Sequence, residues 1–142
     1  MLELLKAIKA KAIGDSDLQT ATAQTGNLTN GIFFDEAPTE AVKPYIVFYI
    51  IDQVFDRCFD SASDVKDASV QFTIVSEAMK NSKGITPATI GDIRNKLVTA
   101  FDRQELSYDT ETNVGCLLEN ESGPSRFDDS WQWTLDFRIL YQ

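Results

Sequence analysis

Four aspartates recur at intervals of four residues in the middle of the chain: Asp52, Asp56, Asp60 and Asp64. This period keeps four carboxylates on one side of either a helix or a strand. Clustered carboxylates can bind Ca²⁺, but the segment from Asp60 to Asp67 lacks the glycine and the closing glutamate of an EF-hand loop. We therefore expect no metal site. A solvated acidic edge that discourages strand-to-strand aggregation, or a specific acidic surface, explains the spacing.

The residues that commonly carry catalysis are missing or badly placed. The chain has no histidine, which removes the commonest general base, the usual triad partner and the commonest transition-metal ligand. It also has no G-x-S-x-G elbow, no GxGxxG loop and no Walker loop. Cys58 and Cys116 stand far apart and form no CxxC pattern, so we interpret them as buried thiols. We predict that the protein is not an enzyme and binds no cofactor.

The charge balance limits the partners. Lys and Arg total 13 against 22 Asp and Glu, a net charge of −9. Binding nucleic acid by neutralising phosphates requires a basic surface, and anionic membranes also attract basic segments. The charge fits a basic protein partner, or a surface that repels DNA. We interpret Lys6, Lys9 and Lys11 near the N-terminus as the solvated side of a helix. No run approaches 18 apolar residues, so we expect no membrane span.

Three segments predict the main strands of a sheet. The apolar run from Lys43 to Ile51 has Pro44 at its entrance and predicts a strand buried on both faces, near the middle of the sheet. Apolar and polar residues alternate from Ala68 to Val75 and, in strict period two, from Trp131 to Tyr141. We interpret residues 52–67 as the projecting arm of a hairpin between the first two strands.

Helical spacing predicts two helices. Leu4, Leu5, Ile8 and Ala12 form one apolar stripe that ends near Gly14, and a second helix runs from Pro87 to about Asp102. The polar segment 15–30 is predicted to be a long loop, 114–118 a short strand and 120–129 a loop. This order predicts an α+β fold, a mainly antiparallel sheet with about two helices packed on one face. Its length of 142 residues predicts a single domain, 1–142.

The order of these pieces carries a family resemblance. Residues 31–38 read as a short strand before an Ala-Pro loop, and residues 44–48 as a Pro-Tyr entrance to an apolar strand. Residues 70–75 contain a Gln in an apolar strand that precedes the helix 88–101, and the chain closes with the alternating strand 133–139. Nearly the whole chain thereby resembles the tail terminator (tail completion) proteins of long-tailed bacteriophages. It departs from many relatives in its long Thr/Gln/Asn-rich segment near the N-terminus.

The resemblance implies a structural role. Such a protein forms a homo-hexameric ring that caps the head-proximal end of the tail tube, ends tube polymerisation and provides the surface where the head docks. The implied partners are the tail tube protein and the head–tail connector protein, in the virion neck, after assembly in the host cytoplasm. DNA would pass through an acidic lumen without specific binding. The residues we assign to lumen lining or inter-subunit contact are Asp52, Asp56, Asp60 and Asp64.

Two other interpretations remain open. Another neck or connector component, or a tail tube subunit, would follow the same ring logic at a different position in the particle. From a different class, an acidic inhibitor that mimics DNA would also explain the charge of −9. Its carboxylates should follow phosphate-like spacing on one exposed face, and it should act as a monomer or dimer.

Overall fold

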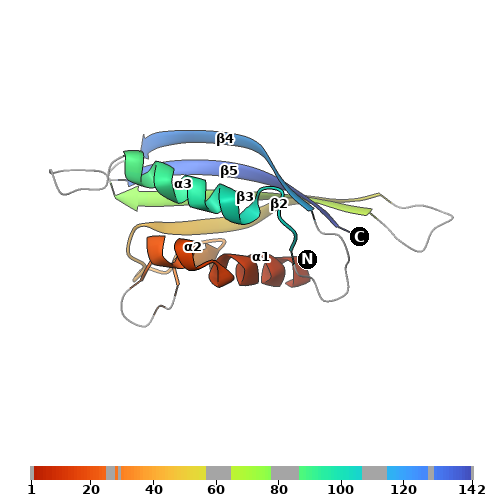
Figure 1. Cartoon of the computed structure of the whole chain (residues 1–142), viewed down its shortest axis with the longest axis horizontal. Helices are drawn as coiled ribbons and strands as arrows, with labels where there is room; N and C mark the ends of the chain where they lie inside the picture. The colour runs from red at the N-terminus through yellow and green to blue at the C-terminus, as the bar shows by residue number, and fades with distance from the viewer. Residues whose placement is uncertain are drawn as a thin grey trace.

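A five-stranded sheet forms one layer of the molecule, and three helices form the other (Figure 1). The computed structural model describes residues 2–24, 28, 30–56, 65–77, 87–106, 115–127 and 130–141. The helices and strands, in chain order, are α1 (Leu2–Gly14), α2 (Ser16–Ala21), β1 (Ile32–Phe34), β2 (Tyr45–Asp56), β3 (Val65–Glu77), α3 (Pro87–Phe101), β4 (Gly115–Phe127) and β5 (Ser130–Tyr141).

The strand order confirms the predicted fold class. The strands lie in the order β1-β2-β3-β5-β4; β1 is parallel to β2, and the other pairs are antiparallel. This is an α+β fold with a mainly antiparallel sheet. The middle strand is β3, and β2, which carries most of the apolar run from Lys43 to Ile51, lies beside it, near the middle of the sheet as predicted.

The core lies between the sheet and the helices. Alternate residues of β3 are fully buried, and Phe72 stands at their centre. Its ring centroid lies 5.7 Å from that of Phe48, 4.9 Å from that of Phe101 and 5.5 Å from that of Phe137. One helix and three strands thus meet around one side chain. The predicted apolar stripe of α3 lies on the same core and comprises Ile90, Ile93, Leu97 and Phe101.

The prediction that the Lys43–Ile51 run is buried on both faces was wrong. Tyr49 is 37% exposed and Ile51 is 51% exposed, whereas Ile46 and Phe48 are fully buried. The reason is architectural, because the helices cover one face of a single sheet and leave the other face open. A strand in such a sheet is buried on alternate residues, even when its sequence is apolar throughout.

The predicted loop at 15–30 contains a short helix, α2. The side chain of Asp15 accepts a hydrogen bond from the backbone N–H of Leu18 at 3.0 Å, which caps the N-terminus of this helix. Leu18 is fully buried in the core. One buried residue in a six-residue helix leaves no periodic pattern, so the sequence did not reveal it.

The strand predicted at 114–118 is much longer than expected. β4 continues to Phe127, through the segment that the sequence predicted as a loop. Its register with β5 shifts at Glu119 and again around Gly123, where φ is +126°. Proline has no backbone N–H to donate, and an edge strand such as β4 can accept Pro124 because only one of its sides pairs with another strand. Exposed side chains on both sides of these shifts hide the alternation that would identify a strand.

An extra residue in β2 decides which way its second half faces. Ile50 pairs with Val70 and Asp52 pairs with Ser69, so Ile51 is a bulge with no partner of its own. In a regular strand, Asp52 would follow Ile46, Phe48 and Ile50 onto the core side. The bulge resets the alternation and places Asp52 on the open side, where it is exposed.

An ion pair between Arg94 and Glu121 connects α3 to the edge strand β4. The Arg94 guanidinium donates from Nε and Nη2 to the two carboxylate oxygens of Glu121, both at 2.8 Å, and lies 5.9 Å from the centroid of the Trp133 ring. The hydrogen bond from Arg94 lowers the pKa of Glu121 and outweighs the opposing effect of burial. The bidentate pair therefore fixes the position of α3 over β4.

The bulge gives a first prediction. Deleting Ile51 restores regular pairing while leaving Asp52 opposite Ser69, so we expect the variant to fold with a melting temperature within about 5 °C of the wild type. The control is deletion of Thr73, in the middle strand, whose register with β5 is unbroken. That deletion turns half of β3 to the wrong face and should abolish cooperative thermal unfolding. Equal loss in both variants, measured by circular dichroism, would contradict the assignment of the bulge.

The lowered pKa of Glu121 gives a second prediction. A carboxyl whose pKa is lower in the folded state stabilises the protein above its unfolded pKa, and that contribution is lost as the pH falls through the folded value. The urea midpoint of the wild type should exceed that of Glu121→Gln at pH 7. The difference should shrink below the ordinary glutamate pKa of about 4.3. A difference that stays constant from pH 7 to the acid limit of folding would show that the pair is not responsible.

Candidate interaction surface: the uncovered face of the sheet

The sheet face opposite the helices carries a continuous row of polar side chains. Tyr49, Gln71, Asp136 and Asn120 are direct partners across β2, β3, β5 and β4. The Tyr49 hydroxyl donates to the side-chain oxygen of Gln71, and the Gln71 amide nitrogen donates to Asp136 at 3.0 Å. The row therefore fixes the direction of three side chains on a surface that no helix covers.

One valine and three small hydroxyl residues occupy the neighbouring row. Val47, Thr73, Thr134 and Ser122 pair directly across the same four strands. Their short side chains keep the middle of the face flat, and Thr73 and Thr134 are only half-buried. We use the term uncovered face for the residues of these two rows together with Asp52, Ser69, Asp67, Glu77 and Arg138.

The uncovered face is acidic. Among the described strand residues it carries the carboxylates of Asp52, Asp67, Glu77 and Asp136 and the guanidinium of Arg138. Arg138 is engaged within the face, since its Nε donates to Asp67 at 2.8 Å and its Nη1 lies 3.9 Å from Glu119. Arg138 is thus neutralised by its neighbours. A second cation, the Lys43 ammonium, donates to Ser130 beside Glu77 at the end of the face. The four carboxylates outnumber these two cations and set the sign of the local potential.

The four aspartates singled out from the sequence fall in different places. Asp52 lies exposed on the uncovered face. Asp56 is the last residue of β2 and pairs with Val65, and its side chain is not among those described. Asp60 and Asp64 lie outside the described residues. Their assignment to lumen lining or inter-subunit contact therefore stays a prediction.

Sequence reasoning missed the residues that give this face its character. Gln71 and Asp136 belong to the polar half of two alternating strands, which the pattern places opposite the core. Nothing in the pattern tells which strands are neighbours, so the row from Tyr49 to Asn120 could not be read from the sequence. Cys116 is buried as expected, and burial raises the pKa of its thiol to about 12. Cys58 lies outside the described residues.

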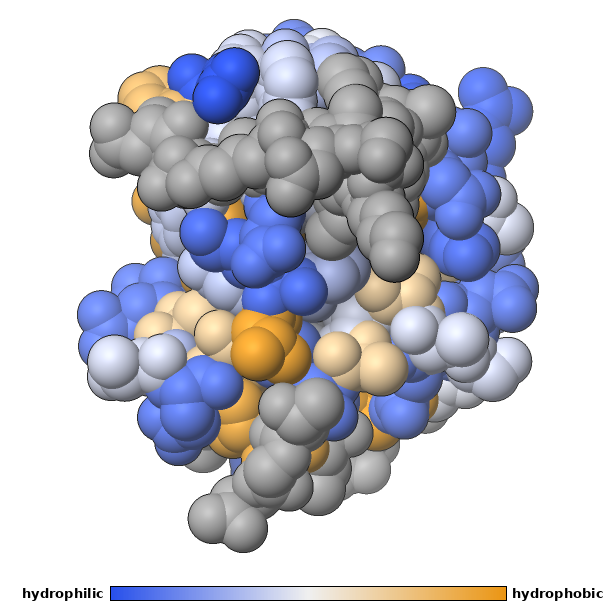
Figure 2. Space-filling model, turned by 90° about the vertical axis from the view of Figure 1, so that its left-hand side faces the viewer, coloured by the Kyte–Doolittle hydropathy of each residue, from blue (hydrophilic) through white to orange (hydrophobic). Residues whose placement is uncertain are grey.

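Apolar side chains are exposed mainly along the two edges of the sheet. At one edge β1 pairs with β2 only as far as Phe48, and at the other β4 has no outer partner among the described strands. The exposed large apolar residues are Phe34, Val42, Tyr49, Ile51, Leu117 and Phe127. By contrast, Figure 2 shows the end of the molecule where α2 and the start of α3 lie, and there the described residues are mostly polar with small apolar patches.

The part of the chain that the structure describes has neither a metal-binding cluster nor a membrane-spanning helix. No group of three His, Cys, Asp or Glu side chains lies close enough together to hold a metal ion. Likewise, none of the described helices is both long and apolar enough to cross a lipid bilayer. The uncovered face and the sheet edges are therefore the features that call for a functional explanation.

Comparison with solved structures shows a likeness that spans nearly the whole chain. No family model matches the chain, and no curated protein matches it. Among solved structures, a chain of the "Virion of native gene transfer agent (GTA) particle" superposes with a TM-score of 0.72, covering 98% of this chain and 94% of that chain. The two sequences are 13% identical, so the likeness shows a shared fold over nearly the whole length of both chains.

Proposed function

We propose that this protein is a structural component of a phage-like virion. More specifically, we propose a tail terminator, a ring that caps the head-proximal end of the tail tube. The observation that carries the proposal is the uncovered, acidic face of a sheet whose fold is shared with a chain of a gene transfer agent virion. A domain covered by helices on one side only has a second side available for a channel or a partner.

The edges of the sheet support assembly into a ring. Both edges have exposed apolar side chains, at Tyr49 and Ile51 on one side and at Leu117 and Phe127 on the other. At the start of β4, residues 102–105 bond to the backbone of Gly115, Cys116 and Leu118, so the outer edge of β4 lacks a partner among the described residues only beyond Leu118. A long exposed edge strand can pair with another chain, so natural proteins usually cover or shorten such edges. Because the two edges differ, contact between them is head-to-tail, and a head-to-tail contact closes into a ring when the rotation allows it. A closed ring buries every edge and gives the tail tube a defined end.

The uncovered face supports a channel for DNA. If it lines the lumen, each subunit contributes hydroxyls and more carboxylates than cations, since Arg138 is bound to Asp67 and Lys43 is bound to Ser130. A surface of this sign repels phosphates within a Debye length of about 8 Å at physiological salt, so DNA slides past without binding. Nothing is catalysed and no cofactor or membrane takes part. The partners are the tail tube protein, the connector and passing DNA.

The alternatives differ in their support. A tail tube subunit or another neck component remains the nearest competitor, since the same ring and the same lumen would serve it. A DNA mimic is less well supported, because a mimic needs its carboxylates free on an exposed face. On the uncovered face, Asp136 accepts from Gln71 and Asp67 accepts from Arg138. These two carboxylates serve the sheet itself.

The proposal predicts a closed ring whose lumen can be converted to bind DNA. Native mass spectrometry of the purified protein should show a species of about 95 kDa, six copies of 15.9 kDa. Asp52→Lys with Asn120→Lys adds three positive charges per subunit to the uncovered face. This variant should keep the ring mass and gain salt-dependent binding of duplex DNA, measured by fluorescence anisotropy at about 0.15 M salt.

A matched variant controls for net charge. Asn95→Lys with Glu105→Lys adds the same charge at exposed positions outside the uncovered face. It should bind DNA at least about tenfold more weakly than the face variant if the uncovered face lines the channel. Equal DNA binding by the two variants would contradict the lumen assignment. A protein that stays monomeric at all concentrations, and also on tail tubes, would contradict the ring itself.

A further inference from the structure

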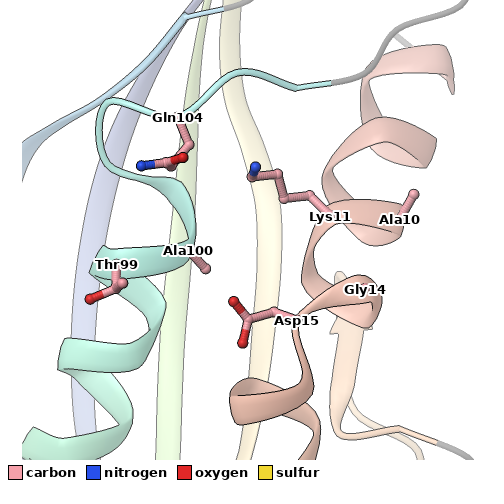
Figure 3. Close-up of a pocket in the computed structure, with 7 residues that line it drawn as sticks. All are labelled: Ala10, Lys11, Gly14, Asp15, Thr99, Ala100 and Gln104. Carbon is pink, nitrogen blue, oxygen red and sulfur yellow. The ribbon is translucent and has the colours of Figure 1, made fainter.

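A pit opens in the helical layer, on the side of the molecule opposite the uncovered face. It has a volume of about 300 Å³ and lies between α1 and α3 (Figure 3). Three of the side chains that line it carry hydrogen-bond donors, and the fourth polar one is a carboxylate. The lining residues are Ala10, Lys11, Gly14, Asp15, Thr99, Ala100 and Gln104.

The donors in the pit are unused. In Figure 3 the Lys11 ammonium points from α1 toward α3, across the opening. Within the described residues, Lys11 has no ion pair, and the side chains of Thr99 and Gln104 have no hydrogen-bond partner. Asp15 forms no ion pair with Lys11, and its Oδ1 accepts a hydrogen bond from the N–H of Leu18, but its carboxylate still carries a negative charge in the pit. A half-buried cation with two neutral donors beside it is suited to an incoming carboxylate.

The rest of the pit is lined by very small residues. Ala10 and Gly14 on α1 and Ala100 on α3 line the pit, and the Ala10 side chain points away from α3, so there is room beside the ammonium for an apolar side chain. The fitting occupant therefore combines a carboxylate with a neighbouring apolar group, on a segment that protrudes from its own protein.

The chain itself presents such a segment. The loop that follows β1 exposes three carboxylates within six residues, and none of them has an ion pair among the described residues: Asp35, Glu36 and Glu40. Exposed apolar residues flank the loop, Phe34 on one side and Val42 on the other. Backbone hydrogen bonds hold its shape, from Asp35 N–H to the Phe48 carbonyl at 2.9 Å and from Ala41 N–H to the Pro38 carbonyl at 3.0 Å.

We propose that the acidic loop, residues 35–41, of one copy docks into the pit of the next copy, with a loop carboxylate on the Lys11 ammonium. The loop does not line the pit of its own chain, and it leaves the sheet at the β1 edge, whereas the pit lies between α1 and α3. The contact is therefore head-to-tail, the type that builds rings. It rests on the proposed ring and names a pair of surfaces that join its subunits.

The test is a charge reversal with a matched control on the same helix. Lys11→Glu should raise the dissociation constant of the oligomer at least about tenfold, measured by native mass spectrometry and sedimentation. Lys9→Glu makes the same charge change at an exposed position of α1 outside the pit and should leave assembly within about twofold of the wild type. Circular dichroism melting checks that both variants are folded.

Reversing the partner charge provides the rescue. Glu36→Lys with Glu40→Lys should weaken assembly alone, and combining it with Lys11→Glu should restore at least part of the lost affinity. The proposal is overturned if Lys11→Glu assembles like the wild type, if Lys9→Glu fails equally, or if the combined variant shows no recovery. It is also overturned if Lys11→Glu forms normal rings but no longer binds tail tubes, because the pit would then serve a different protein. A wild-type protein that never oligomerises, alone or on tubes, removes the proposed ring as well.

Discussion

The packing of Phe72 against three other aromatic rings is the interaction on which the rest of the molecule depends. Phe48 from β2, Phe137 from β5 and Phe101 from α3 all contact it on the same side of the sheet. Because this cluster holds the helical layer to one face, most apolar side chains of each strand are buried on that face. The opposite half of the same strands is mostly polar or half-buried, with Phe33 and Val75 as buried apolar exceptions, and it forms the uncovered face.

The irregularities of the sheet matter as much as its core. The bulge at Ile51 turns Asp52 away from the core and leaves an apolar side chain exposed at the edge. The register shift at Glu119 changes the direction of the residues that follow it in β4. It brings Glu121 to the helix side, where Arg94 binds both of its carboxylate oxygens. Bulges of this kind place charged residues without disturbing the aromatic cluster. The acidic face is thus a consequence of strand register. The proposed ring with a polar channel depends on this face.

The strongly periodic parts of the fold could be predicted from the sequence, and the rest could not for identifiable reasons. The strand from Trp131 to Tyr141 and the stripe from Ile90 to Phe101 repeat their apolar residues often enough to be unambiguous. By contrast, α2 has a single buried residue, and β4 lies on an edge, where exposure removes the pattern. Strand order, the row from Tyr49 to Asn120 and the pit beside Lys11 depend on contacts between segments far apart in the chain. A single sequence does not contain them.

The measurement that tests the central claim most directly is the addition of purified protein to tail tubes that are still growing, followed by electron microscopy. The account predicts a ring at one end of each tube, an unchanged tube wall and arrest of elongation at that end. The Lys11→Glu variant affects capping only if the ring closes before it binds the tube. The wild-type protein is therefore the one that tests the capping function. Tubes that continue to lengthen in the presence of excess protein, with no added density at either end, would contradict the terminator function.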